Sequence, residues 1–258
     1  MLAILRRQGY SLGTHLLSRP MNALVKTACT FVTSSIGRKV IVALTGLSLV
    51  LFLAGHLVGN LLIYGGPETI NAYAYGLHSM PAAALWAIRL GLLVIFLIHV
   101  FLTIQLKLEN KAARGSEGYK KESTIAATLS SRYMIYSGLT ILVFAIFHIL
   151  QYTTRVNIDP ANYAFTFATG ALAGTPTFNV FQMIVDGFSN VWVSAFYVLA
   201  VLMLFSHLRH GVQSIFQTVG LNSRKIRPLY NLIAIVYATV VCLGFVSIPL
   251  SVLAGFIK

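Results

Sequence analysis

Four histidines lie at matched positions in the most apolar parts of the chain. Each of the first four long apolar runs carries one near its carboxyl end, and these are His56, His99, His148 and His210. Neutral imidazole is a common axial ligand of haem iron, and a six-coordinate haem takes one ligand on each face. Four imidazoles on four segments therefore match the demand of two b-type haems, provided that the segments place them in pairs.

The segments that must position these histidines are long enough to cross a membrane. The chain of 258 residues is 57% hydrophobic and 10% charged, whereas a soluble domain has roughly 25% charged residues. A membrane-spanning helix needs about 20 apolar residues. The five runs that satisfy this length are Val40–Tyr64, Ala82–Leu106, Tyr133–Thr153, Val191–Phe216 and Leu229–Ala254.

These runs predict an all-α integral membrane protein, a bundle of five transmembrane helices. Residues 34–258 form the membrane domain, and residues 1–33, which are basic, form an N-terminal interfacial segment. The connection over residues 154–190 is expected to cap the outer face without carrying chemistry. Cys29 and Cys242 are far apart in sequence and indicate neither a disulfide framework nor covalent haem attachment.

The formal charge of +13 is concentrated in the segments that should face the cytoplasm. Basic residues fill the N-terminal segment and the second-to-third and fourth-to-fifth connections, whereas the two opposite loops hold only Arg155. The positive-inside rule therefore places the N-terminus in the cytoplasm. This face binds anionic lipid, a partner protein or both. The residues expected to dock a partner are Lys120, Lys121, Arg224, Lys225 and Arg227.

The direction of each helix sorts the histidines into two pairs by depth. At about 1.5 Å per residue, His56 and His148 lie about 8–12 Å below the outer end, and His99 and His210 lie at a similar distance from the inner end. The two irons would stand on the order of 10–15 Å apart. The five runs contain no Asp or Glu, which disfavours a transporter metal site that mixes carboxylates with histidine.

Small and basic residues near the histidines are further candidates for cofactor contacts. Gly46 and Gly138 each precede a histidine by ten residues, which places them at the depth of the other pair, either against a macrocycle or at ordinary helix contacts. His207 lies three residues before His210 on one broad face, and we expect His210 to be the ligand because Gly211 leaves space beside it. The expected haem propionate partners are Arg89, Arg132 and Arg209.

Several motifs together resemble the di-haem cytochrome b membrane anchor of succinate:quinone oxidoreductases. The resemblance covers residues 34–250 and rests on SSIGRKVIVALTGL, FLAGHLVGN, IRLGLLVIFLIHVFLTIQL, NKAAR, SRYMIYSG, FHILQY and HLRHGVQSIFQTVG. It implies that the four histidines bind two haems b, pairing the first with the third and the second with the fourth. Some family members carry an acid two positions before the fourth ligand, but here that position is Leu208.

The resemblance also implies a place in succinate dehydrogenase or fumarate reductase, enzymes linked to the tricarboxylic acid cycle, in the bacterial cytoplasmic membrane. A flavoprotein with FAD and an iron–sulfur subunit would hold the dicarboxylate chemistry. This chain would pass electrons between the iron–sulfur subunit and a quinone, with menaquinone the commoner partner of two haems.

The quinone site and the complex leave alternatives open. Expected outer-face contacts are Glu68, Asn71, Tyr73 and His78, and an inner site near Arg38, Ser35 and Arg132 is the alternative. A di-haem anchor of another quinone-linked complex, such as a hydrogenase or formate dehydrogenase, fits the same histidines. A haem-free transporter is a further alternative, although it would need polar or broken helices at mid-membrane.

Overall fold

Five helices in the structure are long and apolar enough to cross a membrane, as the sequence predicted. The computed structural model describes residues 22–113, 133–156, 158–221 and 223–258. The five helices are α2 (Ser35–Leu61), α4 (Ala82–Ala112), α6 (Met134–His148), α8 (Val191–Thr218) and α9 (Arg227–Leu253). A π-helical turn, η2 (Ile149–Thr153), continues α6 directly after His148.

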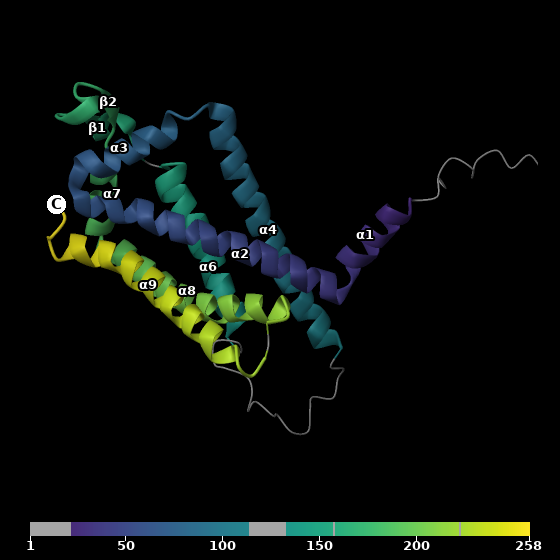
Figure 1. The fold of residues 1–258 in the computed structure, drawn as a ribbon. Helices are drawn as coiled ribbons and strands as arrows, with labels where there is room; N and C mark the ends of the chain where they lie inside the picture. Colours follow the sequence, from purple (N-terminus) through teal and green to yellow (C-terminus); the bar gives the residue numbers. More distant parts are fainter. Residues whose placement is uncertain (1–21, 114–132, 157, 222) are drawn as a thin grey trace, which may run out of the picture.

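Shorter elements form a cap at one end of the bundle (Figure 1). The cap contains α3 (Gly66–His78), α7 (Val180–Ser189) and an antiparallel pair of strands, β1 (Ala164–Thr166) and β2 (Pro176–Phe178). Short turns link them: η1 (Leu62–Gly65), η3 (Pro160–Tyr163) and η4 (Gly170–Leu172). We call this end the cap end, and the opposite end, where α1 (Ala23–Thr33) projects from α2, the basic end.

Local sequence signals define where several of these helices begin. The Ser34 side chain accepts a hydrogen bond of 2.9 Å from Gly37 N and caps α2. Asn190 Oδ1 accepts from Trp192 N at 2.9 Å and caps α8 in the same way. These side chains satisfy amide groups that have no partner within the first helical turn.

The most completely buried part of the bundle lies between α8 and α9, which run side by side (Figure 1). Leu204 and Leu208 of α8 pack with Ala238 and Val241 of α9, and Leu57 of α2 joins them. In contrast, α4 has no buried residue along its whole length. Helix α4 therefore depends on a few specific contacts, or on partners beyond this chain, to hold its position.

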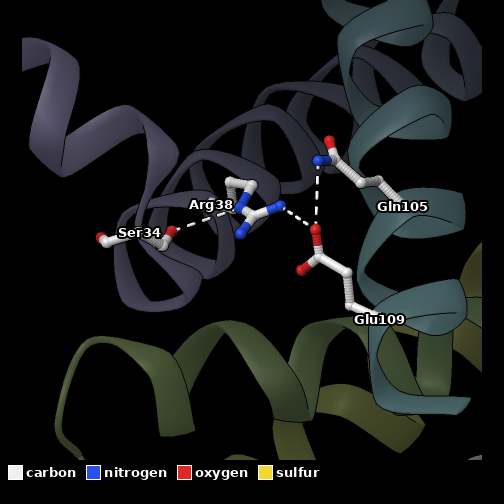
Figure 2. A network of polar contacts seen from close by, with 4 residues as sticks. All are labelled: Ser34, Arg38, Gln105 and Glu109. Carbon is white, nitrogen blue, oxygen red and sulfur yellow. Dashed lines mark hydrogen bonds and ion pairs between the residues drawn. The ribbon is translucent and has the colours of Figure 1, made fainter. Parts of the chain in front are cut away.

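A polar network joins α2 and α4 at the basic end (Figure 2). Arg38 of α2 forms an ion pair with Glu109 of α4, and Gln105 Nε2 donates to the same carboxylate oxygen at 3.1 Å. Arg38 Nε also donates to the Ser34 carbonyl oxygen at 3.3 Å. The first turn of α2 is thus connected to the last two turns of α4, which extends six residues past its predicted end at Leu106.

The cap is attached through a fully buried asparagine. Asn71 of α3 is 0% exposed; its Oδ1 accepts from Phe181 N at 3.0 Å, and its Nδ2 donates to Asn179 Oδ1 at 3.1 Å. Around it, Ile63, Ile70 and apolar residues of α7 join the carboxyl end of α9 in one core cluster. Asn71, one of the residues expected to bind quinone, is therefore a structural link between α3 and α7.

We predict that Asn71→Ala loosens the cap because it leaves the Phe181 amide without its buried acceptor. An unsatisfied buried group of this kind costs about 1–3 kcal/mol. Thermal unfolding of the detergent-solubilised protein should show a lower midpoint for Asn71→Ala, with Asn162→Ala, at an exposed position of the same cap, unchanged. Equal midpoints for the two variants would contradict the assigned role.

Candidate functional site

The structure brings together the two histidines that were predicted to share the outer half of the membrane. His56 of α2 and His148 at the end of α6 lie with their ring centroids 5.7 Å apart and their planes at 87°. Phe52 stacks on His56 at 5.3 Å, and Phe245 of α9 lies 5.7 Å from it. We call His56 and His148 the cap-end pair.

Hydrogen bonds define which nitrogen of His148 is available as a ligand. The Tyr197 hydroxyl lies 3.2 Å from His148 Nδ1 and donates its own proton to Gln151 Oε1 at 3.0 Å. Because a hydroxyl has a single proton, Nδ1 must be the donor toward Tyr197. The lone pair of the neutral imidazole is then on Nε2, the nitrogen that remains for a metal.

A second set of histidines lies closer to the basic end, and a hydroxyl group contacts Nδ1 of these rings as well. His99 Nδ1 of α4 lies 3.1 Å from the hydroxyl of Thr45, which donates to the Ile41 carbonyl at 2.8 Å. Here too the hydroxyl proton is already used, so that Nδ1 donates and Nε2 is free. Gly46 follows Thr45, and a Cβ added there would meet His99 Cε1 at 3.2 Å.

His207 of α8 has an arrangement equivalent to that of His99. Its Nδ1 lies 3.2 Å from the Ser137 hydroxyl, which donates to the Met134 carbonyl at 3.0 Å. A Cβ added at Gly138 would meet His207 Cε1 at 3.3 Å. His207 lies within electrostatic range of both His99 and His210. Because His99 and His207 share the hydroxyl and glycine contacts, we call these two the basic-end pair.

This placement corrects the expectation that Gly138 lies level with His210. The ring beside Gly138 is that of His207, one helical turn before His210. A Cβ added at Gly211 meets nothing within 4 Å, so open space does exist beside position 210, as the sequence argument assumed. Among the described residues, no hydroxyl and no glycine contact the His210 ring in the way that they contact the rings of His99 and His207.

The two halves of the bundle thus repeat one arrangement, in which a hydroxyl residue and a glycine contact a histidine of the neighbouring helix. In α2, Thr45 and Gly46 hold a histidine of α4 and are followed by His56; in α6, Ser137 and Gly138 hold a histidine of α8 and are followed by His148. The spacing from hydroxyl residue to histidine is the same in both helices. Sequence reasoning noted the repeated glycines but did not find Thr45, Ser137 or Tyr197 as histidine partners.

The residues expected to bind quinone at the outer face all lie on α3 and make separate contacts. Glu68 accepts a hydrogen bond from Ala168 N at 2.8 Å within the cap, and the Tyr73 ring packs against the backbone of Gly59. His78 is exposed, with Nδ1 2.8 Å from the Ala74 carbonyl oxygen. With Asn71 buried in its own hydrogen bonds, these four residues act mainly within the cap.

The other predicted contact residues are placed as follows. Arg89 and Arg209 are half-buried on α4 and α8, and Arg224 and Lys225 are exposed between α8 and α9. Arg38 is occupied by Glu109, and Ser35 is exposed in the first turn of α2. Arg132, Lys120 and Lys121 lie outside the described residues.

The donor set fits a metal that brings its own equatorial ligands. Within the described ranges, no three His, Cys, Asp or Glu side chains gather to hold a bare ion. Two neutral imidazoles per site, each with Nε2 available where the hydrogen bonds define it, match a haem, whose ring supplies four nitrogens of its own. A pair of small residues beside each basic-end imidazole keeps its flank free of side chains.

Comparisons with known proteins add no relative: no family model, no curated protein and no solved structure matches this chain.

Proposed function

We propose that this chain is the membrane anchor and electron-transfer subunit of a succinate:quinone oxidoreductase and carries two b haems. The observation that supports the proposal most directly is the arrangement of four imidazoles as two pairs at two depths. In three of the four, Nδ1 is held by a hydroxyl whose proton is already donated elsewhere. Such an outer partner fixes the tautomer and the ring orientation that an axial ligand needs.

The proposed ligand set is His56 with His148 and His99 with His207. It differs from the sequence-based assignment at one position, because His207 rather than His210 has the hydroxyl partner and the glycine beside its ring. His210 and Arg209, which follow on the same helix, become candidates for contacts at the edge of the basic-end haem.

Each haem, when bound, exchanges one electron at its iron. The side chains of this protein hold the iron ligands and control their surroundings. Thr45, Ser137 and Tyr197 hold three imidazoles in one tautomer and orientation, while Phe52 and Phe245 pack against the ring of His56. A rigid, apolar environment of this kind reduces the reorganisation of polar groups when the charge on a site changes.

The proposed partners are an iron–sulfur subunit and a flavoprotein that carries FAD, with a quinone, menaquinone by preference, as the electron-exchange substrate. The iron–sulfur subunit would dock at the basic end, where Arg224 and Lys225 are exposed. Our expectation places this end in the bacterial cytoplasm. Of the expected quinone residues, Asn71 is buried and Arg38 is ion-paired with Glu109, whereas Tyr73 and His78 are exposed.

Two other functions compete with this one. An anchor of a hydrogenase or formate dehydrogenase would use the same paired histidines, and co-purification with succinate-dependent quinone reduction distinguishes it. A haem-free transporter is the other, and haem content distinguishes it. The hydroxyl-bound imidazoles favour a haem protein over a transporter, because a transport pathway has no need of a fixed tautomer at two depths.

We predict that the purified chain carries two haems b. A pyridine haemochrome assay should return two haems per polypeptide, and the dithionite-reduced spectrum should show low-spin, six-coordinate haem. One haem or none per chain would exclude the proposed function.

We predict that His207→Ala loses one of the two haems and that His210→Ala retains both. The reason is that the Ser137 hydroxyl and Gly138 serve the ring of His207. Haem content and the low-spin spectrum of each purified variant provide the measurement. If His210→Ala loses the haem and His207→Ala does not, the fourth ligand is His210, and the side-chain arrangement of α8 described above does not persist in the holoprotein.

We predict that Gly46→Val and Gly138→Val each impair the basic-end haem, because the added Cβ would already crowd an imidazole at 3.2 or 3.3 Å. Matched controls are Gly76→Val and Gly91→Val, at helical glycines whose added Cβ meets nothing within 4 Å. The first two should show partial loss of one haem or a shifted low-spin spectrum, and the controls should bind two. Two intact haems in all four variants would mean that these glycines only allow helix contact.

A further inference from the structure

An arginine lies inside α4 at the level of the cap-end pair. Arg89 precedes His99 by ten residues, and His99 contacts Gly46, which precedes His56 by ten residues on the neighbouring helix. Since α2 and α4 run in opposite directions, Arg89 and His56 both lie about 15 Å toward the cap end from the Gly46–His99 contact. A charged side chain at such a depth is costly in a membrane and is a candidate functional residue by default.

A second arginine, Arg155, follows the π-helical turn that begins after His148. Its backbone has φ of 55°, and it is the single non-glycine residue with positive φ in the described part of the chain. Its guanidinium lies 3.7 Å from the centroid of the Phe178 ring. Its Nε is buried and has no hydrogen-bond partner in the structure. A strained backbone that holds an unsatisfied buried donor is a feature that clusters at binding sites.

These two cations are close enough to affect each other. Burial lowers the pKa of Arg155, and the guanidinium of Arg89 lowers it further. Among the described residues the ion pair is that of Arg38 with Glu109, at the other end of the bundle. Of the described cap acids, Glu68 accepts from the Ala168 amide, Asp159 from the Ala161 amide and Asp186 from Gln182 Nε2. Among the described residues, no carboxylate forms an ion pair with either of these two guanidinium groups.

We propose that Arg89 and Arg155 bind the propionate carboxylates of the haem held by His56 and His148. The proposal rests on the proposed function, because that haem is the anion required. A guanidinium matches a carboxylate with two parallel hydrogen bonds, and Arg155 Nε is a donor still in need of an acceptor. Arg155 follows His148 by seven residues, about 10 Å along the helix axis, so the propionate edge of this haem points toward the cap.

This assignment has an electrochemical consequence. Oxidation adds one positive charge at the iron, and nearby cations oppose that change. The two arginines therefore favour the reduced form of the cap-end haem and keep its propionates ionised. Removing either guanidinium should lower the midpoint potential of one haem and leave the other haem unchanged.

The test uses the full chain with both haems bound and follows each haem by potentiometric titration of its absorbance. The variants are Arg89→Gln, Arg155→Asn and their combination; Asn tolerates the positive φ at position 155 better than most residues do. The control Lys111→Gln removes one exposed cation from the same helix at the basic end. Arg89→Lys and Arg155→Lys retain the positive charge but cannot form two parallel hydrogen bonds to a carboxylate.

We expect one midpoint potential to fall in each single variant and to fall further in the combination. It should recover in part in the lysine variants and should become newly dependent on pH near neutrality as a propionate begins to titrate. Two unchanged potentials in variants that still bind two haems would overturn the inference and leave the proposed function standing. If the arginine variants lose copurifying anionic lipid while both midpoint potentials stay unchanged, the inference is also overturned. A wild-type chain without haem would instead remove the proposed function itself.

Discussion

A hydroxyl group that has already donated its proton to its own helix is the interaction on which the rest of this arrangement depends. Thr45 and Ser137 each bond a carbonyl of the preceding turn and then accept from the histidine of a neighbouring helix. This geometry requires the two helices to approach closely, and the glycine that follows each hydroxyl residue permits it. Helix α4, which buries no residue of its own, is positioned mainly by this contact and by the Arg38–Glu109 pair.

The elements without histidine ligands have a different task. Helix α9 contributes Ala238 and Val241 to the densest part of the bundle, and Tyr237 donates a hydrogen bond to the Val50 carbonyl of α2. The cap closes the end nearest the cap-end pair through α7 and Asn71. Packing is thus concentrated in α8, α9 and the cap, and α8 also carries His207 and the Tyr197 partner of His148. A bundle organised in this way can keep a stable frame beside a site that needs a bulky planar group.

The five long helices could be predicted from the sequence because runs of about 20 apolar residues have few other structures available. The pairing of His56 with His148 followed from helix direction and rise per residue, and the structure confirms that the two rings meet. The sequence favoured His210 over His207 because Gly211 leaves space beside it, but both residues lie on one broad face and differ in depth by a single turn. The structure places the ring of His207 beside Ser137 and Gly138. The spacing of residues in the sequence could not show that the Ser137 hydroxyl contacts the ring of His207 and not that of His210.

The cap was harder to anticipate for a physical reason. Its polar residues satisfy one another over long separations, as when Asn71 bonds Phe181 and Glu68 bonds Ala168, and a single sequence carries no signal for such pairs. Gly66 to His78 forms a helix where a loop was expected, so the residues expected to bind quinone lie on one helix of the cap. The strained Arg155 was visible in the sequence only as the one basic residue of the outer loops.

The two halves of the bundle differ at one informative place. Ten residues before His207 stands Tyr197, which holds the Nδ1 of His148, and ten residues before His99 stands Arg89. Both lie at the level of the cap-end pair, yet one supplies a hydroxyl to a ligand and the other a positive charge. His56 has no hydroxyl partner in the described structure; Asn60 Nδ2 lies 3.4 Å from its ring nitrogens and donates to its carbonyl at 2.7 Å. The repeat is therefore complete at the basic-end pair and broken at the cap-end pair, where α8 supplies a hydroxyl to His148 and α4 carries Arg89.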